Sequence, residues 1–476
     1  MKIIERLVSN IYIKLLFWFC LSALFMIGYP LSPFFEQFPF HDSGVYITES
    51  DMILNGAVIY RDFIEQKGPL LYLFEVGGLS VGGLSAIWCL CCLWGAIIAA
   101  ITDKICSIFS NNAVAVFITA TITMLMTERF GGNNTAELIV TPFLLWSIYL
   151  LLKSFCDQRI PPFLHSFIIG MTISIIIFVK ANIAGVPLFL LFVFFVYSIK
   201  KNQIKTFIIC ISGVIVGALA VVAPIMAYFM HKNALSDFIN TYFLFNYKFA
   251  ANTSEPISII DRFLIFIKLS FLKPVCIFGW CFVLLAFFIE KSKKELKIFL
   301  LCLSIIIVEA VSVAFIPGRD HFYYITPMLP LFAFFIIMCL SANGLYQKVS
   351  IVGTVALFAY LGTKSVHEIM VRPVIYKEEL NLCAFIKEHT SKEDNVIFYN
   401  APVGCYFSSG KLCPSKYPYV IPNGFLRDEI IADYLSREPL YFVIKEGKTF
   451  PMDRLIGYEQ IDYPSKTYKI FKLLEY

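Results

Sequence analysis

The stretch FPFHDSGVYITESDMILNGAVIYRDFIEQKGPL, residues 38–70, carries the densest mixture of charges in a chain that is otherwise poor in them. Of the 476 residues only 15% are charged and 58% are hydrophobic, whereas about a quarter of a soluble globular chain is charged. Long apolar segments flank the stretch on both sides, and about 20 apolar residues are enough to cross a bilayer. These features predict a polytopic α-helical membrane protein. The net charge of +5 reflects lysines in loops and indicates no nucleic-acid partner.

The chain outside this stretch contains many apolar runs of the length of a membrane span. We predict 11 transmembrane helices in a membrane domain that covers residues 1–364. The expected spans lie near residues 12–32, 84–102, 113–127, 135–153, 163–179, 183–199, 206–229, 263–289, 298–316, 322–342 and 349–364. No small-residue cleavage site precedes Pro30, so the first run is interpreted as an uncleaved span rather than a signal peptide.

The loops between these runs alternate in character. One set is short and rich in lysine, and the positive-inside rule places it in the cytoplasm together with the N-terminus. The opposite set contains the two long loops, residues 33–83 and 230–262, which are then predicted to face outward. An odd number of spans also puts the C-terminal region outside. The short lysine-rich loops fit a bacterial inner membrane.

From about residue 365 the composition becomes that of a soluble protein. We expect a small extracytoplasmic α/β domain over residues 365–476. Its predicted helices are 377–390 and 428–439, and its predicted strands are 395–399, 439–445 and, as an edge strand, 466–474. Most of the 14 cysteines lie in spans as small packing residues. Cys405 and Cys413 lie in the polar region, where they either form a disulfide or, since Cys383 is a third thiol there, remain free.

Helix signals account for part of the charged stretch. Asp42 and Ser43 suit the N-cap of a helix that Gly56 ends, and Pro69 suits the first turn of the next. The loop is thus predicted to form two short helices along the membrane surface. The glycine-rich segment 77–83 is interpreted as a bend or a close helix contact rather than as a phosphate-binding loop.

The remaining pattern resembles a known family. The order of Asp42, Gly56, Tyr60-Arg61-Asp62 and Lys67-Gly68-Pro69 is similar to the first outer loop of the GT-C superfamily of membrane glycosyltransferases, in the branch of the protein O-mannosyltransferases and the lipid A aminoarabinose transferase. The resemblance covers the whole chain. Further matching motifs are Asn134-Thr135-Ala136-Glu137, Lys180-Ala181-Asn182 and Gly318-Arg319-Asp320-His321-Phe322-Tyr323-Tyr324.

The resemblance implies transfer of a hexose or pentose from a polyprenyl-phosphate donor to an acceptor hydroxyl at the outer face of the membrane, with inversion. It implies that the outer loop 33–83 is catalytic and that the outer loop 230–262 is substrate-related. It also implies Asp42 as the general base, because a carboxylate at the membrane surface can take the acceptor proton. The leaving phosphate needs fixed positive charge or hydrogen-bond donors. The other residues assigned to substrate binding are Arg61, Asp62, Lys67, Glu137, Lys180, Asn182, Arg319, His321 and Tyr324, of which Lys67, Lys180, Arg319 and His321 are the candidates for the phosphate.

Each of these assignments has an ordinary structural alternative. Asp42 could be only a helix cap, and Arg61, Asp62 and Lys67 could be a solvated loop with local ion pairs. Lys180 could extend its side chain to the membrane interface, and Glu137 could be a first-turn acid that the helix dipole favours. His321 and Tyr324 are also typical of an interfacial aromatic belt.

Neither a cofactor nor a metal follows from the sequence. The resemblance leaves a divalent metal open, but Ser43 stands where many relatives carry Glu, so a second acidic ligand is missing there. The partners expected are the polyprenyl-phosphate sugar, the bilayer, and a glycan, lipid or protein acceptor. A transporter or flippase for a lipid-linked or polar solute is the alternative, although it usually shows mid-span polar residues and internal repeats. A polysaccharide polymerase or ligase is expected to carry its catalytic groups in a late outer loop.

Overall fold

A computed structural model describes residues 10–132, 134–251, 258–315, 319–420, 426–447 and 450–474. Gly318 of the motif before the late span and part of the predicted loop 230–262 lie outside these residues. The chain divides into two compact units. Unit 1 comprises Met1–Ile27, Cys89–Ile225 and Ile257–His367, and unit 2 comprises Gly28–Trp88, Met226–Pro256 and Glu368–Tyr476.

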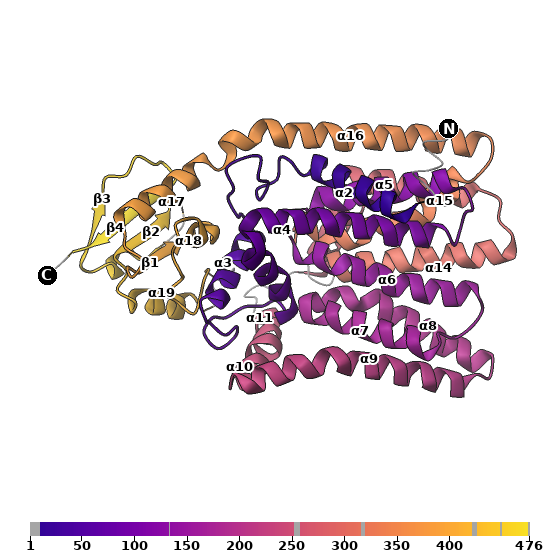
Figure 1. Cartoon of the computed structure of the whole chain (residues 1–476), viewed down its shortest axis with the longest axis horizontal. Helices are drawn as coiled ribbons and strands as arrows, with labels where there is room; N and C mark the ends of the chain where they lie inside the picture. The colour runs from indigo at the N-terminus through magenta and orange to yellow at the C-terminus, as the bar shows by residue number, and fades with distance from the viewer. Residues whose placement is uncertain are drawn as a thin grey trace. The chain divides into compact units, whose positions relative to one another are not determined.

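Unit 1 is helical throughout its described residues (Figure 1). It contains the elements α2 (Ile11–Phe25), α5 (Ala113–Gly131), α6 (Ala136–Cys156), α7 (Phe163–Lys180), η1 (Ala181–Ala184), α8 (Gly185–Lys200), α12 (Ile259–Ser270), α13 (Pro274–Phe288), α14 (Lys293–Ala310), η3 (Val311–Phe315), η4 (Phe322–Phe332) and α15 (Ala333–Leu340). Three further helices run from one unit into the other: α4 (Pro69–Cys106), α9 (Ile204–His231) and α16 (Leu345–Ile375).

Unit 2 combines short helices with a small sheet. Its helices are α3 (Asp42–Leu54), α10 (Leu235–Phe238), η2 (Ile239–Phe245), α11 (Asn246–Ala251), α17 (Lys377–His389), α18 (Gly404–Ser408), α19 (Arg427–Leu435) and η6 (Met452–Arg454). Its strands are β1 (Val396–Tyr399), β2 (Tyr441–Lys445), β3 (Tyr458–Ile461) and β4 (Tyr468–Leu473). The α/β character predicted for the C-terminal region is confirmed.

The helices confirm a multi-pass membrane protein. Among the described residues, 8 helical segments are long and apolar enough to cross a membrane, or 9 if a bent pair of helices is one span. The predicted number of 11 spans differs from this number because of three parts of the chain. The bent pair is α12 and α13, which meet at 81°. The helix α2 is shorter than a full span. The helices α7 and α8 follow each other so closely that they count as one segment of 38 residues.

The segment of α7 and α8 nevertheless turns back on itself. Lys180 has an extended backbone (φ −155°, ψ 93°) that interrupts the helix. Tyr197, near the end of α8, donates a hydrogen bond of 2.8 Å to the carbonyl of Gln158, which precedes α7. Because the end of α8 returns to the start of α7, the two helices are antiparallel, as the prediction of two spans requires. Both pack against α6.

Glycines bring α7 and α9 into backbone contact within unit 1. A Cβ on Gly170 of α7 would overlap the carbonyl oxygen of Val214. A Cβ on Gly217 of α9 would in turn overlap the carbonyl oxygen of Phe167. With Gly213, Gly217 forms the small-xxx-small spacing that lets membrane helices approach closely.

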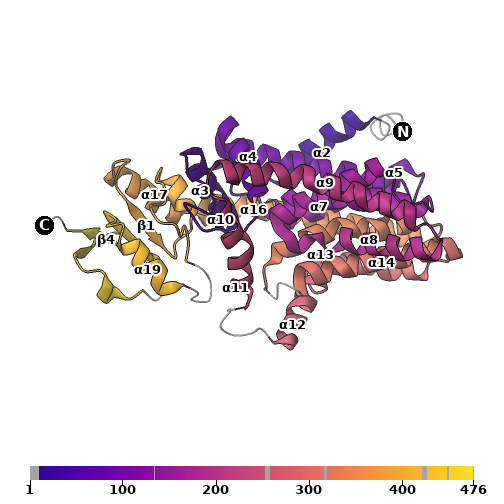
Figure 2. The same ribbon diagram turned by 90° about the horizontal axis from the view of Figure 1, so that it is seen from below.

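The sheet in unit 2 has the strand order β1-β2-β4-β3, with β1 and β2 parallel and the other neighbours antiparallel. The two views in Figures 1 and 2 show α17 and α19 on opposite faces of the strands. Ile430 and Tyr434 of α19 join the apolar core beside Phe442, whereas Phe385 of α17 packs against Tyr441, the neighbour of Phe442 on β2. Successive side chains of β2 point to opposite faces of the sheet, and each face is covered by one helix.

One expectation for this region is wrong. The predicted edge strand 466–474 is β4, which lies inside the sheet between β2 and β3; the edges are β1 and β3, and β3 is a polar strand that the sequence pattern does not reveal. Of the two alternatives for Cys405 and Cys413, the structure has the free thiols, and both are buried. The thiol of Cys413 lies 3.5 Å from the carbonyl oxygen of Ser415 instead.

The glycine-rich segment 77–83 is a bend inside α4, as predicted. Gly82 and Gly83 leave the helical conformation there, and Gly83 adopts φ 64° with ψ −149°. This region of backbone space is essentially open only to glycine. Residues 69–81 therefore form a separate helix after the charged loop, and it begins at Pro69 as the sequence indicates.

Candidate active site

The first predicted site residue, Asp42, begins helix α3. It is half-buried, and its Oδ2 accepts a hydrogen bond of 3.1 Å from the hydroxyl of Tyr46 one turn later. The N-cap is His41, at φ 53°, and it makes no side-chain cap hydrogen bond. The interpretation of Asp42 and Ser43 as the cap is therefore wrong. Burial lowers the pKa of His41 although the charge of Asp42 opposes this, so the neutral imidazole is favoured beside the carboxylate. The C-terminal end of the helix is as predicted, with Gly56 at φ 100°.

Helix α3 is fixed against the C-terminal part of unit 2. A Cβ on Gly44 would come within 2.9 Å of the backbone nitrogen of Gly404, so the two segments touch through glycines. The hydroxyl of Thr48 donates a hydrogen bond of 3.0 Å to the carbonyl of Val403. The backbone around residue 404 thus determines where Asp42 lies within the unit.

Arg61 and Asp62 form the local ion pair that their sequence neighbourhood suggests. The pair spans 2.9 Å, and both side chains are more than a third exposed. Its hydrogen bond lowers the pKa of Asp62, and the other carboxylate contact is the N–H of Val58 at 2.7 Å. Arg61 also donates to the carbonyl of Lys232 at 3.2 Å. These contacts shape the loop, and an exposed pair of this kind adds only about 0–1 kcal/mol.

Lys67 lies in a turn whose backbone is held from both sides. Its N–H donates to Oε1 of Glu65 at 2.8 Å, and the same oxygen accepts the N–H of Gln66 at 2.6 Å. Its carbonyl accepts a hydrogen bond of 2.7 Å from the hydroxyl of Tyr60. Tyr60 is buried at φ 73°, a conformation that non-glycine residues rarely adopt. The rings of Phe229, Phe238 and Tyr242 surround the Tyr60 ring, with 5.6–6.1 Å between ring centres.

Two buried acids lie next to this turn, and the sequence analysis predicts no role for either of them. Glu49 of α3 is 0% exposed and Glu65 is 2% exposed. Burial and the charge of Glu65 raise the pKa of Glu49 well above its usual value, while the Tyr72 hydroxyl and the charge of Lys67 act in the opposite direction. Glu49 therefore favours its protonated form. The sequence shows the two acids only as charges of a polar loop, because neither the periodicity of α3 nor the loop composition distinguishes a buried acid.

Unit 1 brings together a second group of predicted residues. Glu137 lies in the first turn of α6 and is 1% exposed, and it forms an ion pair with Lys180 at the end of α7. The ammonium of Lys180 lies 3.8 Å from the centre of the Tyr324 ring and 6.0 Å from that of Tyr323. The side chain of Lys180 therefore lies between Glu137 and the Tyr324 ring within unit 1 rather than extending to the membrane interface.

The other members of the group surround this ion pair or lie near it in sequence. His321 stacks on Tyr323 at 5.5 Å between ring centres and meets Tyr324 at 5.1 Å. Asn182 donates a hydrogen bond of 3.1 Å to the carbonyl of Ser312, in the π-helical segment η3. Arg319 is half-buried and precedes Asp320, which forms an exposed ion pair with Lys268. The structure therefore assembles His321, Tyr324, Lys180 and Glu137, while Asn182 fixes the turn that follows Lys180.

No metal site is evident in the part of the chain that the structure describes. No group of three or more His, Cys, Asp or Glu side chains there is placed to hold a metal ion. Ser43, which stands where relatives carry a second acid, is buried. A hydroxyl at this position provides no anionic ligand for the hard cations that prefer oxygen.

Comparison with solved structures identifies the fold. The chain matches the crystal structure of ArnT from Cupriavidus metallidurans bound to undecaprenyl phosphate, with a TM-score of 0.62 and 11% sequence identity, over 95% of this chain and 97% of that one. The apo structure of the same protein matches with the same TM-score and identity, over 95% of this chain and 96% of that one. The fold is thus an ArnT-like GT-C fold, and the resemblance drawn from the sequence motifs is confirmed at this level.

The particular family follows from a sequence model. The model of the putative competence-induced protein Ccs4 N-terminal domain matches residues 3–354, and the chain belongs to this family. No curated protein matches the chain.

Proposed function

We propose that the protein is a glycosyltransferase that moves a sugar from a polyprenyl-phosphate donor to an acceptor hydroxyl. The observation that supports this most strongly is the ArnT-like fold over 95% of the chain. One of the matching ArnT structures holds undecaprenyl phosphate, which is the lipid part of such a donor. The residues that the sequence pattern selects lie in both units of this fold.

In the proposed reaction the acceptor oxygen attacks the anomeric carbon of the donor sugar. A bond forms between these two atoms while the bond from the anomeric carbon to the phosphate oxygen breaks, with inversion. The acceptor proton passes to Asp42, and the electron pair of the broken bond leaves with the polyprenyl phosphate. A positioned base contributes about 10²–10⁴-fold to such a step. The half-buried position of Asp42 at the start of helix α3 supports this role.

The leaving phosphate gains negative charge as the bond breaks, so fixed cations lower the barrier. Lys67, Lys180, Arg319 and His321 are proposed for this role, and His321 contacts Tyr324, the ring beneath the ammonium of Lys180. The ammonium of Lys180 is held in place by Glu137 and the Tyr324 ring. A cation that is positioned before the substrate arrives needs no reorganisation during the reaction, which is where such electrostatic contributions are largest. The Oε2 atom of Glu137 is buried without a hydrogen-bond partner in the described residues, and it is proposed to accept a sugar hydroxyl.

The site is proposed to face the outside of a bacterial inner membrane, with a glycan, lipid or protein hydroxyl as the acceptor. The lysine-rich short loops support this orientation through the positive-inside rule. A lipid-linked donor stays in the bilayer, so the reacting groups are expected at the membrane surface.

The test uses the purified full chain with radiolabelled polyprenyl-phosphate sugars, one sugar at a time. Release of polyprenyl phosphate with one donor supports the proposal and identifies the sugar. The Asp42→Asn variant should lose this release, whereas Glu36→Gln, which changes an exposed acid of the same loop, should retain it. Translocation of the intact donor across vesicles without cleavage would instead support the transporter alternative and overturn the proposal.

A further inference from the structure

The C-terminal sheet domain of unit 2 contacts the Lys67 turn through one short segment, residues 413–419. The N–H of Ile64 donates a hydrogen bond of 2.8 Å to the carbonyl of Lys416 in this segment. The hydroxyl of Tyr419 donates to Oε2 of Glu65 at 3.4 Å. Two contacts from one segment thus reach the residues that directly precede Lys67.

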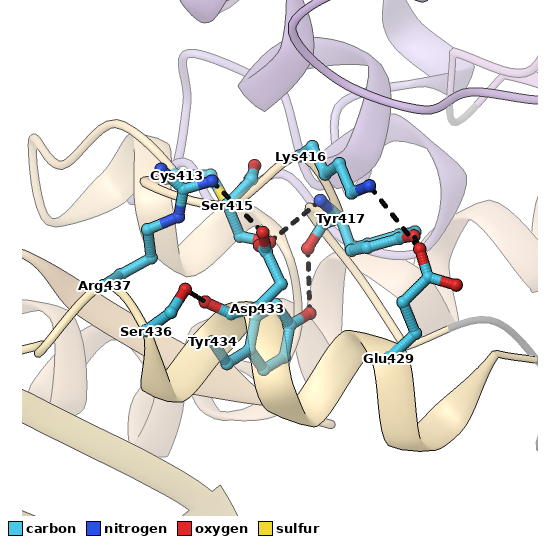
Figure 3. A network of polar contacts seen from close by, with 9 residues as sticks. All are labelled: Cys413, Ser415, Lys416, Tyr417, Glu429, Asp433, Tyr434, Ser436 and Arg437. Atoms are coloured by element: carbon cyan, nitrogen blue, oxygen red, sulfur yellow. Dashed lines mark hydrogen bonds and ion pairs between the residues drawn. The ribbon is translucent and has the colours of Figure 1, made fainter.

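The segment 413–419 is itself fixed to helix α19, as Figure 3 shows. The hydroxyl of Ser415 donates to Asp433 at 2.5 Å, and the hydroxyl of Tyr434 donates to the carbonyl of Tyr417 at 2.8 Å. The hydroxyl of Tyr417 is bonded to Glu429. Because Tyr434 also belongs to the apolar core against the strands, the position of the segment depends on the folded sheet domain.

Glu65 joins this segment to the turn with both of its carboxylate oxygens. Oε2 faces Tyr419, and Oε1 accepts the N–H groups of Gln66 and Lys67. The side chain is 2% exposed, so water cannot replace these contacts easily, and a buried acceptor left without its donors is costly. An exposed acid in a loop could take its hydrogen bonds from water, whereas buried Glu65 takes them from the protein.

We infer that Glu65 is a positioning residue for Lys67, and that Tyr419 is the residue through which the sheet domain holds Glu65 in place. The inference rests on the proposed function, in which Lys67 contacts the leaving phosphate. Both carboxylate oxygens of Glu65 are engaged, by Tyr419 and by the N–H groups of Gln66 and Lys67, so Glu65 acts on the backbone of the turn rather than on the substrate. The sheet domain thereby contributes to the donor site without providing a ligand to it.

The first experiment measures the turn without any ligand. Hydrogen–deuterium exchange of the purified full chain is followed in the peptide that contains Gln66 and Lys67. Tyr419→Phe removes one hydroxyl and should raise exchange at these two amides. Tyr458→Phe is the matched control, because its hydroxyl bonds the carbonyl of Pro439 elsewhere in the same sheet domain. Unchanged exchange in Tyr419→Phe would overturn the link between the sheet domain and the turn.

The second experiment measures binding of undecaprenyl phosphate in a double-mutant cycle. Lys67→Ala should weaken binding about tenfold, the range for losing a hydrogen bond to a charged group. Glu65→Ala should weaken it about fivefold in the wild-type background but by less than about twofold when Lys67 is already alanine, since residues that act through one another are not additive. Equal losses in both backgrounds would show that Glu65 acts elsewhere.

The variant Glu65→Gln separates positioning from loss of folding. Glutamine keeps an oxygen for the two N–H groups and a polar atom for Tyr419, so it should restore both slow exchange and near wild-type binding. A Glu65→Gln protein that folds and binds as poorly as Glu65→Ala would contradict the inference. If wild-type protein fails to bind undecaprenyl phosphate, the proposed function and the ligand part of the inference fall together, and the exchange result still decides whether the sheet domain holds the turn.

Discussion

The ammonium of Lys180 lies 3.8 Å from the centre of the Tyr324 ring while it forms an ion pair with Glu137, 43 residues earlier in the chain. A charge at the centre of a membrane costs at least about 2.5 kcal/mol, and such residues usually face a partner or a cavity. Lys180 has two partners of different kinds, one anionic and one aromatic. Removal of Glu137 and removal of the Tyr324 ring are therefore expected to differ from each other in their effects on stability and on donor use.

Substitution of Lys180 should affect both folding and donor use. Lys180→Met leaves the buried carboxylate of Glu137 without its cation, and breaking a buried pair costs about 3–5 kcal/mol. The double variant Lys180→Met/Glu137→Gln removes both charges and should recover most of the thermal stability. Sugar transfer should stay low in the double variant, with the donor KM affected more than the acceptor KM. Recovery of full activity with stability would mean that the pair has only a structural role.

Asp42, the proposed general base, should be required for sugar transfer. Asp42→Asn keeps the shape of the side chain and its hydrogen bond from Tyr46, but an amide cannot take the acceptor proton. We expect a fall of at least about 100-fold in kcat, the lower end for a general base, with an unchanged melting temperature. Full activity of purified Asp42→Asn would exclude this carboxylate as the base.

The buried acid Glu49 should make the stability of the protein depend on pH. Its pKa in the folded chain lies well above the ordinary value of 4.5 for glutamate, so the unfolded chain loses this proton at a lower pH than the folded chain. Since the folded state then binds more protons, stability should fall as the pH rises above about 4.5 and level off above the folded pKa. Glu65, Tyr72 and Lys67 face the group and set that upper limit.

The comparison that tests this is the melting temperature of Glu49→Gln against wild type between pH 4 and 9. The amide cannot ionise, so the variant should show a smaller decline with rising pH. Parallel curves for the two proteins would assign the pH dependence to other groups.

The predicted orientation can be tested at an exposed position of the sheet domain. Ser415 is unsuitable for labelling because it is buried and bonded to Asp433. Ile456 is 85% exposed, so Ile456→Cys should react with a membrane-impermeant maleimide in intact cells. Lys201→Cys, in a predicted cytoplasmic loop, should react only after lysis. The reverse pattern would invert the topology.

Much of the fold follows from the sequence because hydropathy and helix end signals are local. Pro69 and Gly56 mark helix ends, and the apolar runs mark the spans. What the local pattern misses is the path of the backbone at interruptions, such as the 81° bend between α12 and α13. It also misses strand order, because the position of β4 inside the sheet depends on pairing between distant segments.

The candidate site could be predicted only as separate motifs. The sequence identifies Glu137, Lys180 and Tyr324 as unusual, and the fold shows that they touch. It gives no reason to select Glu65, because a Glu in a mixed-charge loop is ordinarily solvated. Its burial results from Tyr419, more than 350 residues away in the chain, and no periodicity in the loop encodes such a neighbour.

The glycine contact between α7 and α9 has a consequence for how the protein is made. The two helices are separated in the chain by α8, so their carbonyl and glycine surfaces cannot meet until α8 has already entered the bilayer. During synthesis the backbone around Gly170 has no packing partner until α9, the second long helix after α7, has been made. Mutations to larger residues at Gly170 or Gly217 should therefore appear first as failures of membrane assembly and protein turnover, before any loss of catalytic rate can be measured.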